Sequence, residues 1–98
     1  MSKEKKVARQ QVFRHIDGNK HFWAANGTII RSMFELAGAL EGMDGYTFAQ
    51  HVNEGKNDFG NWAKDVLQDQ ELAEKLYSSK DLGDHKTLVL RHIVEKIK

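Results

Sequence analysis

The sequence predicts a small α+β domain that is mostly helical. An Asn-Gly pair lies between two runs of strand-forming residues, which is typical of a β-hairpin. Several later segments carry apolar residues at helical spacing behind a Ser, Asp or Asn cap. The chain has 98 residues, of which 40% are hydrophobic and 30% charged, as in one globular domain. We therefore expect one β-hairpin at about residues 21–31, packed on four to five short helices.

We expect two regions along the chain. Residues 1–10 form a flexible basic N-terminal segment, and residues 11–98 form a single small helical domain. The N-terminus has no apolar signal-peptide core, and no run approaches the ~18 apolar residues of a membrane span. The chain contains no cysteine, which excludes disulfides and thiolate metal sites. These features predict a cytoplasmic protein without a membrane partner.

The hairpin is the first element that the residue pattern defines. Asn26 and Gly27 tolerate the positive φ angles of a two-residue turn. The strands that flank this turn then pair Ala25 with Thr28, Ala24 with Ile29, and Trp23 with Ile30. Because an isolated hairpin is only marginally stable in water, one of its faces must pack on helices.

A helix is expected directly after the hairpin. Ser32, followed three residues later by Glu35, matches the capping-box pattern. The expected helix places four apolar side chains on one face, namely Met33, Leu36, Ala37 and Leu40. Gly42 is its expected terminator.

The same signals predict the remaining helices. Their expected caps, in chain order, are Asp44, Asn57 or Asp58, Asp69, and Asp84. Gly55 is expected to end the first of them in a left-handed conformation. The helix after residue 57 has the most regular apolar stripe, which contains Phe59, Trp62, Ala63, Val66 and Leu67. The buried stripe expected in the last helix contains Leu90, Ile93, Val94 and Ile97.

Residues 26–76 resemble a small domain of unknown function that occurs in archaeal and bacterial proteins. The resemblance rests on the hairpin turn, on S-x-x-E-L-A-x-A-L from Ser32, on F-x-x-H-V-x-x-x-K-N-D-F-x-x-W-x-x-D-V from Phe48, and on D-x-x-L-A from Asp69. The run H-V-x-x-x-K-N-D-F-x-x-W is its most specific part. The resemblance implies one compact intracellular domain with an accessory role, and it implies no particular activity.

The polar run over residues 51–67 does not match a known catalytic or metal-binding pattern. The five histidines, at positions 15, 21, 51, 85 and 92, include no pair spaced four apart. The segment around Lys56 also lacks the ligand spacing of a calcium loop. His51 and Asp58 are a conceivable acid–base pair, but no nucleophile motif or phosphate-binding loop accompanies them. We expect a non-enzymatic protein without a metal or cofactor.

Two interpretations of the polar run remain. In the structural one, Asn57 or Asp58 caps a helix, and His51 bridges either to the loop or to Asp58. The Trp62 indole donates to a backbone carbonyl, and Gly60 indicates that another backbone lies close. In the functional one, the side chains form a ridge that binds a partner. The candidate residues are His51, Asn53, Lys56, Asn57, Asp58, Asn61 and Asp65, with Glu54, Lys64 and Gln68 beside them.

Two function classes follow. The first is a protein-interaction or regulatory accessory module that uses this ridge or the hairpin. An exposed apolar hairpin face would also be able to drive a homodimer, so both a monomer and a homodimer stay open. The alternative is nucleic-acid binding through basic N- and C-terminal segments. The candidate contacts for nucleic acid are Lys3, Lys5, Lys6, Arg9, Arg14, Lys86, Arg91 and Lys96.

The charge distribution motivates this alternative. Residues 1–20 hold six Lys/Arg against two acids, and residues 85–98 hold four against one, whereas residues 21–84 hold five against eleven. Basic ends attract polyanions. They can equally neutralise the acidic middle of the same chain by lying against it.

Overall fold

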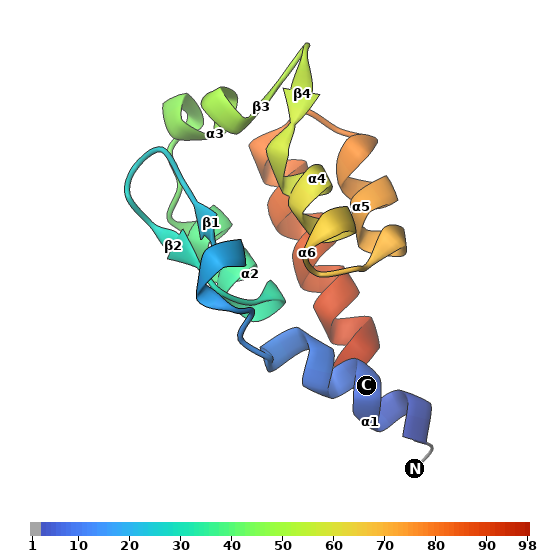
Figure 1. Ribbon diagram of the computed structural model, residues 1–98. Helices are drawn as coiled ribbons and strands as arrows, with labels where there is room; N and C mark the ends of the chain where they lie inside the picture. Colours follow the sequence, from blue (N-terminus) through green and yellow to red (C-terminus); the bar gives the residue numbers. More distant parts are fainter. Residues whose placement is uncertain (1–2) are drawn as a thin grey trace.

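A computed structural model describes residues 3–98, with side chains from residue 7 onward. The described residues form six α-helices, one short 3-10 helix and two antiparallel two-stranded sheets (Figure 1), which confirms the predicted fold class. The elements in chain order are α1 (Lys3–Phe13), η1 (Gly18–Lys20), β1 (Phe22–Trp23), β2 (Ile29–Ile30), α2 (Met33–Glu41), α3 (Gly45–His51), β3 (Val52–Asn53), β4 (Lys56–Asn57), α4 (Asp58–Asp65), α5 (Gln70–Tyr77) and α6 (Leu82–Ile97).

Helix α1 crosses the boundary that the sequence places at residue 10, and the first two residues of the basic segment lie outside the described part. It packs against α2 and α6, so the two ends of the chain lie close together (Figure 1). The Nε of Arg9 donates to the carbonyl oxygen of Ile97 at 2.8 Å. Within the described residues, no helix is both long and apolar enough to cross a membrane.

The first hairpin forms where expected, but its register differs by one residue. We expected Trp23 opposite Ile30, whereas Ile30 pairs with Phe22 and Trp23 pairs with Ile29. The loop thus has three residues and ends at Gly27, whose φ of 91° is left-handed, a common hairpin geometry. Because side chains alternate between faces, this register buries Phe22 and Ile30 together and leaves Trp23 and Ile29 exposed.

Helix α2 follows the prediction closely. The hydroxyl of Ser32 accepts from the Glu35 amide at 3.1 Å, and the four apolar residues of the expected stripe are buried. The Glu35 carboxylate accepts from the Arg31 amide at 2.9 Å. Gly42 ends the helix with a φ of −96°, outside the left-handed region.

The segment between α3 and α4 differs from the prediction. Asp44 caps α3 by accepting from the Thr47 amide at 2.6 Å, and the helix ends at His51. A second hairpin, β3–β4, follows, and Gly55 lies in its turn without the left-handed φ that was expected. The side chain of Asn53 supports the turn by accepting from the Gly55 amide at 3.0 Å. Strands of two residues are too short to produce a recognisable alternation, so the sequence did not indicate this hairpin.

The starts of α4 and α5 agree with the expected caps, and the start of α6 does not. Asn57 caps α4 by accepting from the Gly60 amide at 2.9 Å, and Asp69 caps α5 by accepting from the Leu72 amide at 3.0 Å. The cap of α6 is Asp81, so the helix begins at Leu82, before the predicted cap Asp84.

The buried stripe of α6 is also rotated from the expected one. Leu90 and Val94, expected inside, are 47% and 48% exposed. The buried residues are His85, Val89, His92 and Ile93. The prediction was wrong because it built the stripe from aliphatic residues alone, whereas a histidine with polar partners can lie in a core.

Phe59 of α4 occupies the centre of the core. Its ring is fully buried, with ring centroids 4.8 Å from Phe22 and 6.0 Å from Phe48. The indole Nε1 of Trp62 donates to the carbonyl oxygen of Lys20 at 2.8 Å, as the structural interpretation predicted. The Trp62 bond and the Phe22 contact thus attach the N-terminal half of the chain to α4. Val66 follows the end of α4 and is only partly buried, like Leu67.

A side chain approaches Gly60, not the backbone that we expected. A Cβ at this position would lie 2.5 Å from Cε1 of Tyr77, so the tyrosine ring of α5 covers the glycine. The Tyr77 hydroxyl also donates to Oδ1 of Asn61 at 2.5 Å. Gly60 therefore allows α4 and α5 to pack closely through Tyr77.

A double-mutant cycle tests this contact. In a helix, replacing glycine by alanine normally raises the free energy of unfolding by about 1 kcal/mol. We expect Gly60→Ala to give that gain in the Tyr77→Ala variant, and to give little or none when Tyr77 is present. Urea unfolding of the four proteins measures the difference. Equal gains in both backgrounds would show that the ring does not cover Gly60.

Candidate functional site

His51 connects the first hairpin to the start of α4. The Ala25 amide donates to its Nε2 at 2.9 Å, so this nitrogen is an acceptor. In the neutral ring Nδ1 then carries the proton and donates to Oδ2 of Asp58, 3.0 Å away. The predicted bridge to Asp58 is present. Because both ring nitrogens bond within the protein, His51 has no nitrogen available for acid–base chemistry in this arrangement.

The Asn57 side chain joins three helices. Its Oδ1 caps α4 at the Gly60 amide, and its Nδ2 donates to the Leu76 carbonyl oxygen at 2.8 Å, at the end of α5. The same Nδ2 lies 3.2 Å from Nε2 of His85 in α6. Every polar atom of this side chain is used inside the protein, which favours the structural interpretation.

His85 is fully buried beside Asn57. Its Nδ1 lies 3.2 Å from the Asp81 carbonyl oxygen and donates to it, while Nε2 accepts from Asn57. Burial lowers the pKa of His85, although the Asp81 carbonyl opposes this effect. The neutral ring is therefore a structural part of the joint between α4 and α6.

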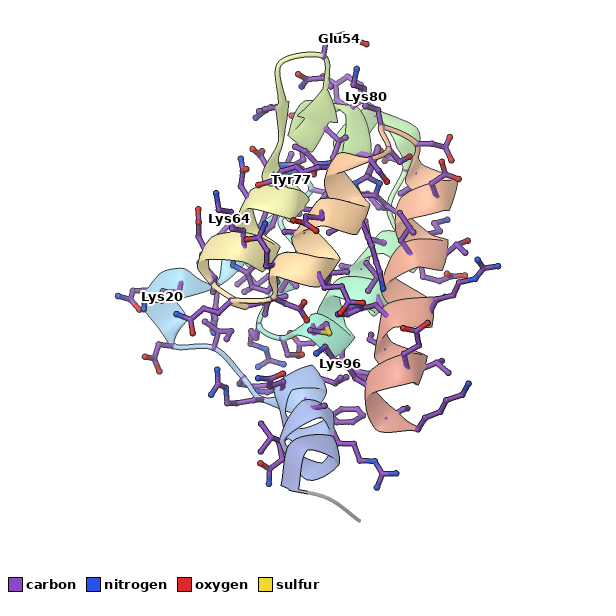
Figure 2. All side chains as sticks on the ribbon, turned by 90° about the vertical axis from the view of Figure 1, so that its right-hand side faces the viewer. Lys20, Glu54, Lys64, Tyr77, Lys80 and Lys96 are labelled. Atoms are coloured by element: carbon purple, nitrogen blue, oxygen red, sulfur yellow. The ribbon has the colours of Figure 1, made fainter. Side chains whose placement is uncertain are left out.

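Four of the predicted ridge residues do come together. A shallow depression of about 400 Å³ lies between the β3–β4 turn and α5. Figure 2 shows Glu54 and Lys80 at its upper end, where they form an ion pair at 2.9 Å, and Tyr77 below them. The predicted residues that line it are Asn53, Lys56, Asn57 and Asn61.

The polar side chains of this depression bond to other groups of the protein, inside the depression and next to it. Lys56 lies 3.0 Å from Asp58, and the Asn53 amide donates to the Ala49 carbonyl oxygen at 3.1 Å. Three predicted residues do not line the depression: His51, Asp58 and Asp65. Asp65 is exposed outside it, as are Lys64 and Gln68. These internal bonds favour the structural interpretation of the ridge.

A second buried polar cluster connects α5 to α6. Nε2 of His92 lies 2.8 Å from Oδ2 of Asp69, and Nζ of Lys75 lies 3.0 Å from its Nδ1. Because an ammonium group can only donate, Nδ1 is the acceptor and Nε2–H donates to Asp69. Nζ of Lys96 lies 3.4 Å from the same carboxylate oxygen.

These contacts control the ionisation of Asp69. Burial alone would raise its pKa, but hydrogen bonds from His92 and the Leu72 amide, together with the positive charge of Lys96, hold the pKa well below its ordinary value. Asp69 thus stays ionised while it caps α5. The sequence contained a signal for this cluster, because His85, Val89 and His92 recur at i, i+4 and i+7 on one helix face.

These polar clusters do not form a metal site. Within the part of the chain that the structure describes, no three His, Asp or Glu side chains are grouped to hold an ion.

The candidate nucleic-acid residues are only partly available. Lys96 is bound to Asp69, and Lys86 is half-buried. Arg14 and Arg91 are exposed, without an ion pair among the described residues. The side chains of Lys3, Lys5 and Lys6 lie outside the described part. The packing of α1 on α6 nevertheless places the two basic segments at the same end of the protein.

A second hollow on the surface is lined mainly by apolar groups and includes residues of the first hairpin, but none of the predicted ridge residues. It is an open groove of about 1090 Å³ between the first hairpin, α2 and α6. Its exposed apolar lining comes from Ile29, Phe34 and Leu90, which are 40%, 55% and 47% exposed. Phe13 of α1 extends this surface, since its ring centroid lies 5.2 Å from that of Phe34. We call these four residues the apolar face.

The sequence offered the hairpin as an alternative to the ridge, but the full extent of the apolar face was missed for two reasons. Leu90 was assigned to the core, and the register error placed Trp23, not Phe22, opposite Ile30. Only the position of Phe34 indicated an exposed apolar residue, because Phe34 lies outside the buried stripe of α2.

Comparisons of the chain with protein-family models, with curated proteins and with solved structures found no match. The resemblance to a domain of unknown function therefore stays a prediction, and the arrangement of side chains is the guide to function.

Proposed function

We propose that the protein is a non-enzymatic interaction module that binds a protein partner through the apolar face. The observation that carries this proposal is the exposure of Phe34, Ile29 and Leu90 around one groove. Exposed apolar side chains that are grouped, not scattered, are characteristic of interaction surfaces. Burying them against a partner would contribute roughly 25 cal/mol for each Å² of apolar surface removed from water.

Two features agree with an accessory role of this kind. The polar ridge at residues 53–61 bonds internally, which leaves the apolar face as the better surface for a partner. The chain also lacks cysteine, which suits a reducing compartment, and we propose a cytoplasmic location.

Removing the apolar face should abolish association without unfolding the protein. We expect the double variant Phe34→Ser, Leu90→Ser to lose association with the partner, because exposed apolar contacts supply the binding energy. Its free energy of unfolding should change by no more than about 1 kcal/mol, since both side chains are largely exposed. Association is measured by sedimentation velocity and by cross-linking in cell extract.

Tyr46→Ser is the matched control. Tyr46 is an 80% exposed aromatic residue on α3, outside the groove, so its removal should leave association intact. Loss of association in both variants, or in neither, would contradict the assignment of the apolar face.

Nucleic-acid binding remains a second candidate because α1 lies against α6. This packing joins the basic segments, and Arg14 and Arg91 are exposed. An amide NMR titration with short duplex DNA and single-stranded RNA tests it. Shifts confined to α1 and the end of α6 that vanish at high salt would support this function. A silent titration would remove it.

A further inference from the structure

The exposed face of α2 contains a protruding ring next to an open space. Phe34 and Gly38 lie four residues apart on one helix face, so they are neighbours along the groove. Phe34 is 55% exposed, and apart from the two adjacent residues and the backbone of α2 itself, no atom lies within 4 Å of the position where a Cβ of Gly38 would be. The helix thus presents a bulky side chain and, one turn away, a gap that could receive one.

Two charged residues lie at opposite ends of the same face. Arg31 lies just before the start of α2, and Glu41 is its last residue; both line the groove. Arg31 is paired with Glu35 at 2.7 Å and still has 48% of its side chain exposed. Glu41 is exposed and has no ion pair among the described residues. One end of the face thus presents a half-exposed guanidinium that already pairs with Glu35, and the other end presents an acid without an ion pair among the described residues.

A two-fold axis would make these features complementary. In an antiparallel pair of α2 helices centred between Phe34 and Gly38, each Phe34 meets the Gly38 of the other copy. The same register places each Arg31 opposite the Glu41 of the other copy. Self-complementarity of one patch is what an isologous dimer requires. A glycine in the contact also lets two helices approach closely, and ring packing then fills the gap.

We propose that the partner on the apolar face is a second copy of this chain, held by antiparallel packing of α2 on α2. This proposal rests on the function proposed above and names the partner. The Phe34 ring supplies the apolar contact, and the pairs between Arg31 and Glu41 determine the register. Leu90 and Ile29 would border the same interface.

Filling the gap is the first test. Gly38 is a helix residue in open space, so Gly38→Leu should leave the isolated chain as stable as before or more stable, because leucine favours helix. We expect the same substitution to raise the dimer dissociation constant at least about tenfold, since Phe34 loses its space in the other copy. Sedimentation velocity over a range of concentrations gives the constant. If Gly38→Leu stabilises the isolated chain but leaves the dimer dissociation constant unchanged, the proposal is wrong.

A charge exchange tests the register. Glu41→Arg places two arginines opposite each other, and Arg31→Glu places two acids opposite each other, so neither variant should dimerise well. An equimolar mixture should form a heterodimer, because both of its cross-pairs are attractive. Native mass spectrometry distinguishes the species. Two variants that dimerise normally, or a mixture without heterodimer, would show that α2 does not pair in this register.

The outcomes separate this inference from the function on which it rests. If the wild-type chain stays monomeric at all concentrations while Phe34→Ser, Leu90→Ser still releases a cross-linked partner, the second copy is wrong and the interaction module stands. If that double variant changes no association at all, both proposals fail.

Discussion

Asn57→Ala is expected to lower the free energy of unfolding by about 3 kcal/mol. The loss of a side-chain cap contributes about 1 kcal/mol. The rest comes mainly from Nε2 of buried His85, which loses its donor, because a buried acceptor without a partner costs about 1–3 kcal/mol; the Leu76 carbonyl loses one donor but keeps the Ser79 amide at 3.3 Å. Urea unfolding at neutral pH measures the change.

Two related variants separate the contributions. Asn57→Ser keeps an oxygen that can cap α4 but loses the amide donor, so it should recover only the capping part. Asn61→Ala removes an exposed asparagine of the same helix and should cost less than about 1 kcal/mol. If Asn57→Ala costs no more than Asn61→Ala, Asn57 is not the joint between α4, α5 and α6. If Asn57→Ala instead weakens partner binding and leaves the free energy of unfolding unchanged, the ridge is the binding site.

Asp69→Ala has the other large expected effect, a loss of about 3–5 kcal/mol. The substitution removes the cap of α5 and leaves the buried His92 and the partly buried Lys96 without their anionic partner. Breaking a buried ion pair from one side is costly because the remaining polar or charged group is uncompensated. Asp65→Ala, at an exposed position at the end of α4, is the control and should change stability by less than about 0.5 kcal/mol.

The contribution of Asp69 to the free energy of unfolding should decrease as the pH falls. Its pKa in the folded protein is held well below the unfolded value of about 3.9, so the folded state favours the ionised form. The resulting stabilisation is complete above pH 5 and decreases as the pH falls toward the folded pKa. The stability difference between wild type and Asp69→Asn should therefore be smaller at pH 3 than at pH 5. A difference that grows on acidification would contradict the ionised state of Asp69.

Much of the fold could be predicted because the signals were local. The caps at Ser32, Asp44 and Asp69 were predicted correctly, and Asn57 was one of two candidates for the cap of α4, since a capping side chain bonds to an amide two or three residues away. The bridge between His51 and Asp58 was also within reach, because only one short turn separates the two residues. The role of the predicted ridge could not be decided from the sequence, because Asn57 bonds to Leu76 and His85, which lie 19 and 28 residues further along the chain.

The sequence by itself determined the fold class, most helix starts and the buried stripe of α2, because these depend on propensity, capping and periodicity within a few residues. Only the tertiary structure decided the hairpin register, the burial of His85 and His92, and the exposure of Leu90. Each of these depends on what a distant segment places opposite the residue: a core that accepts Phe22, a carboxylate that satisfies His92, or a groove that leaves Leu90 uncovered. A residue pattern describes one element, whereas burial and function depend on the surface where several elements meet.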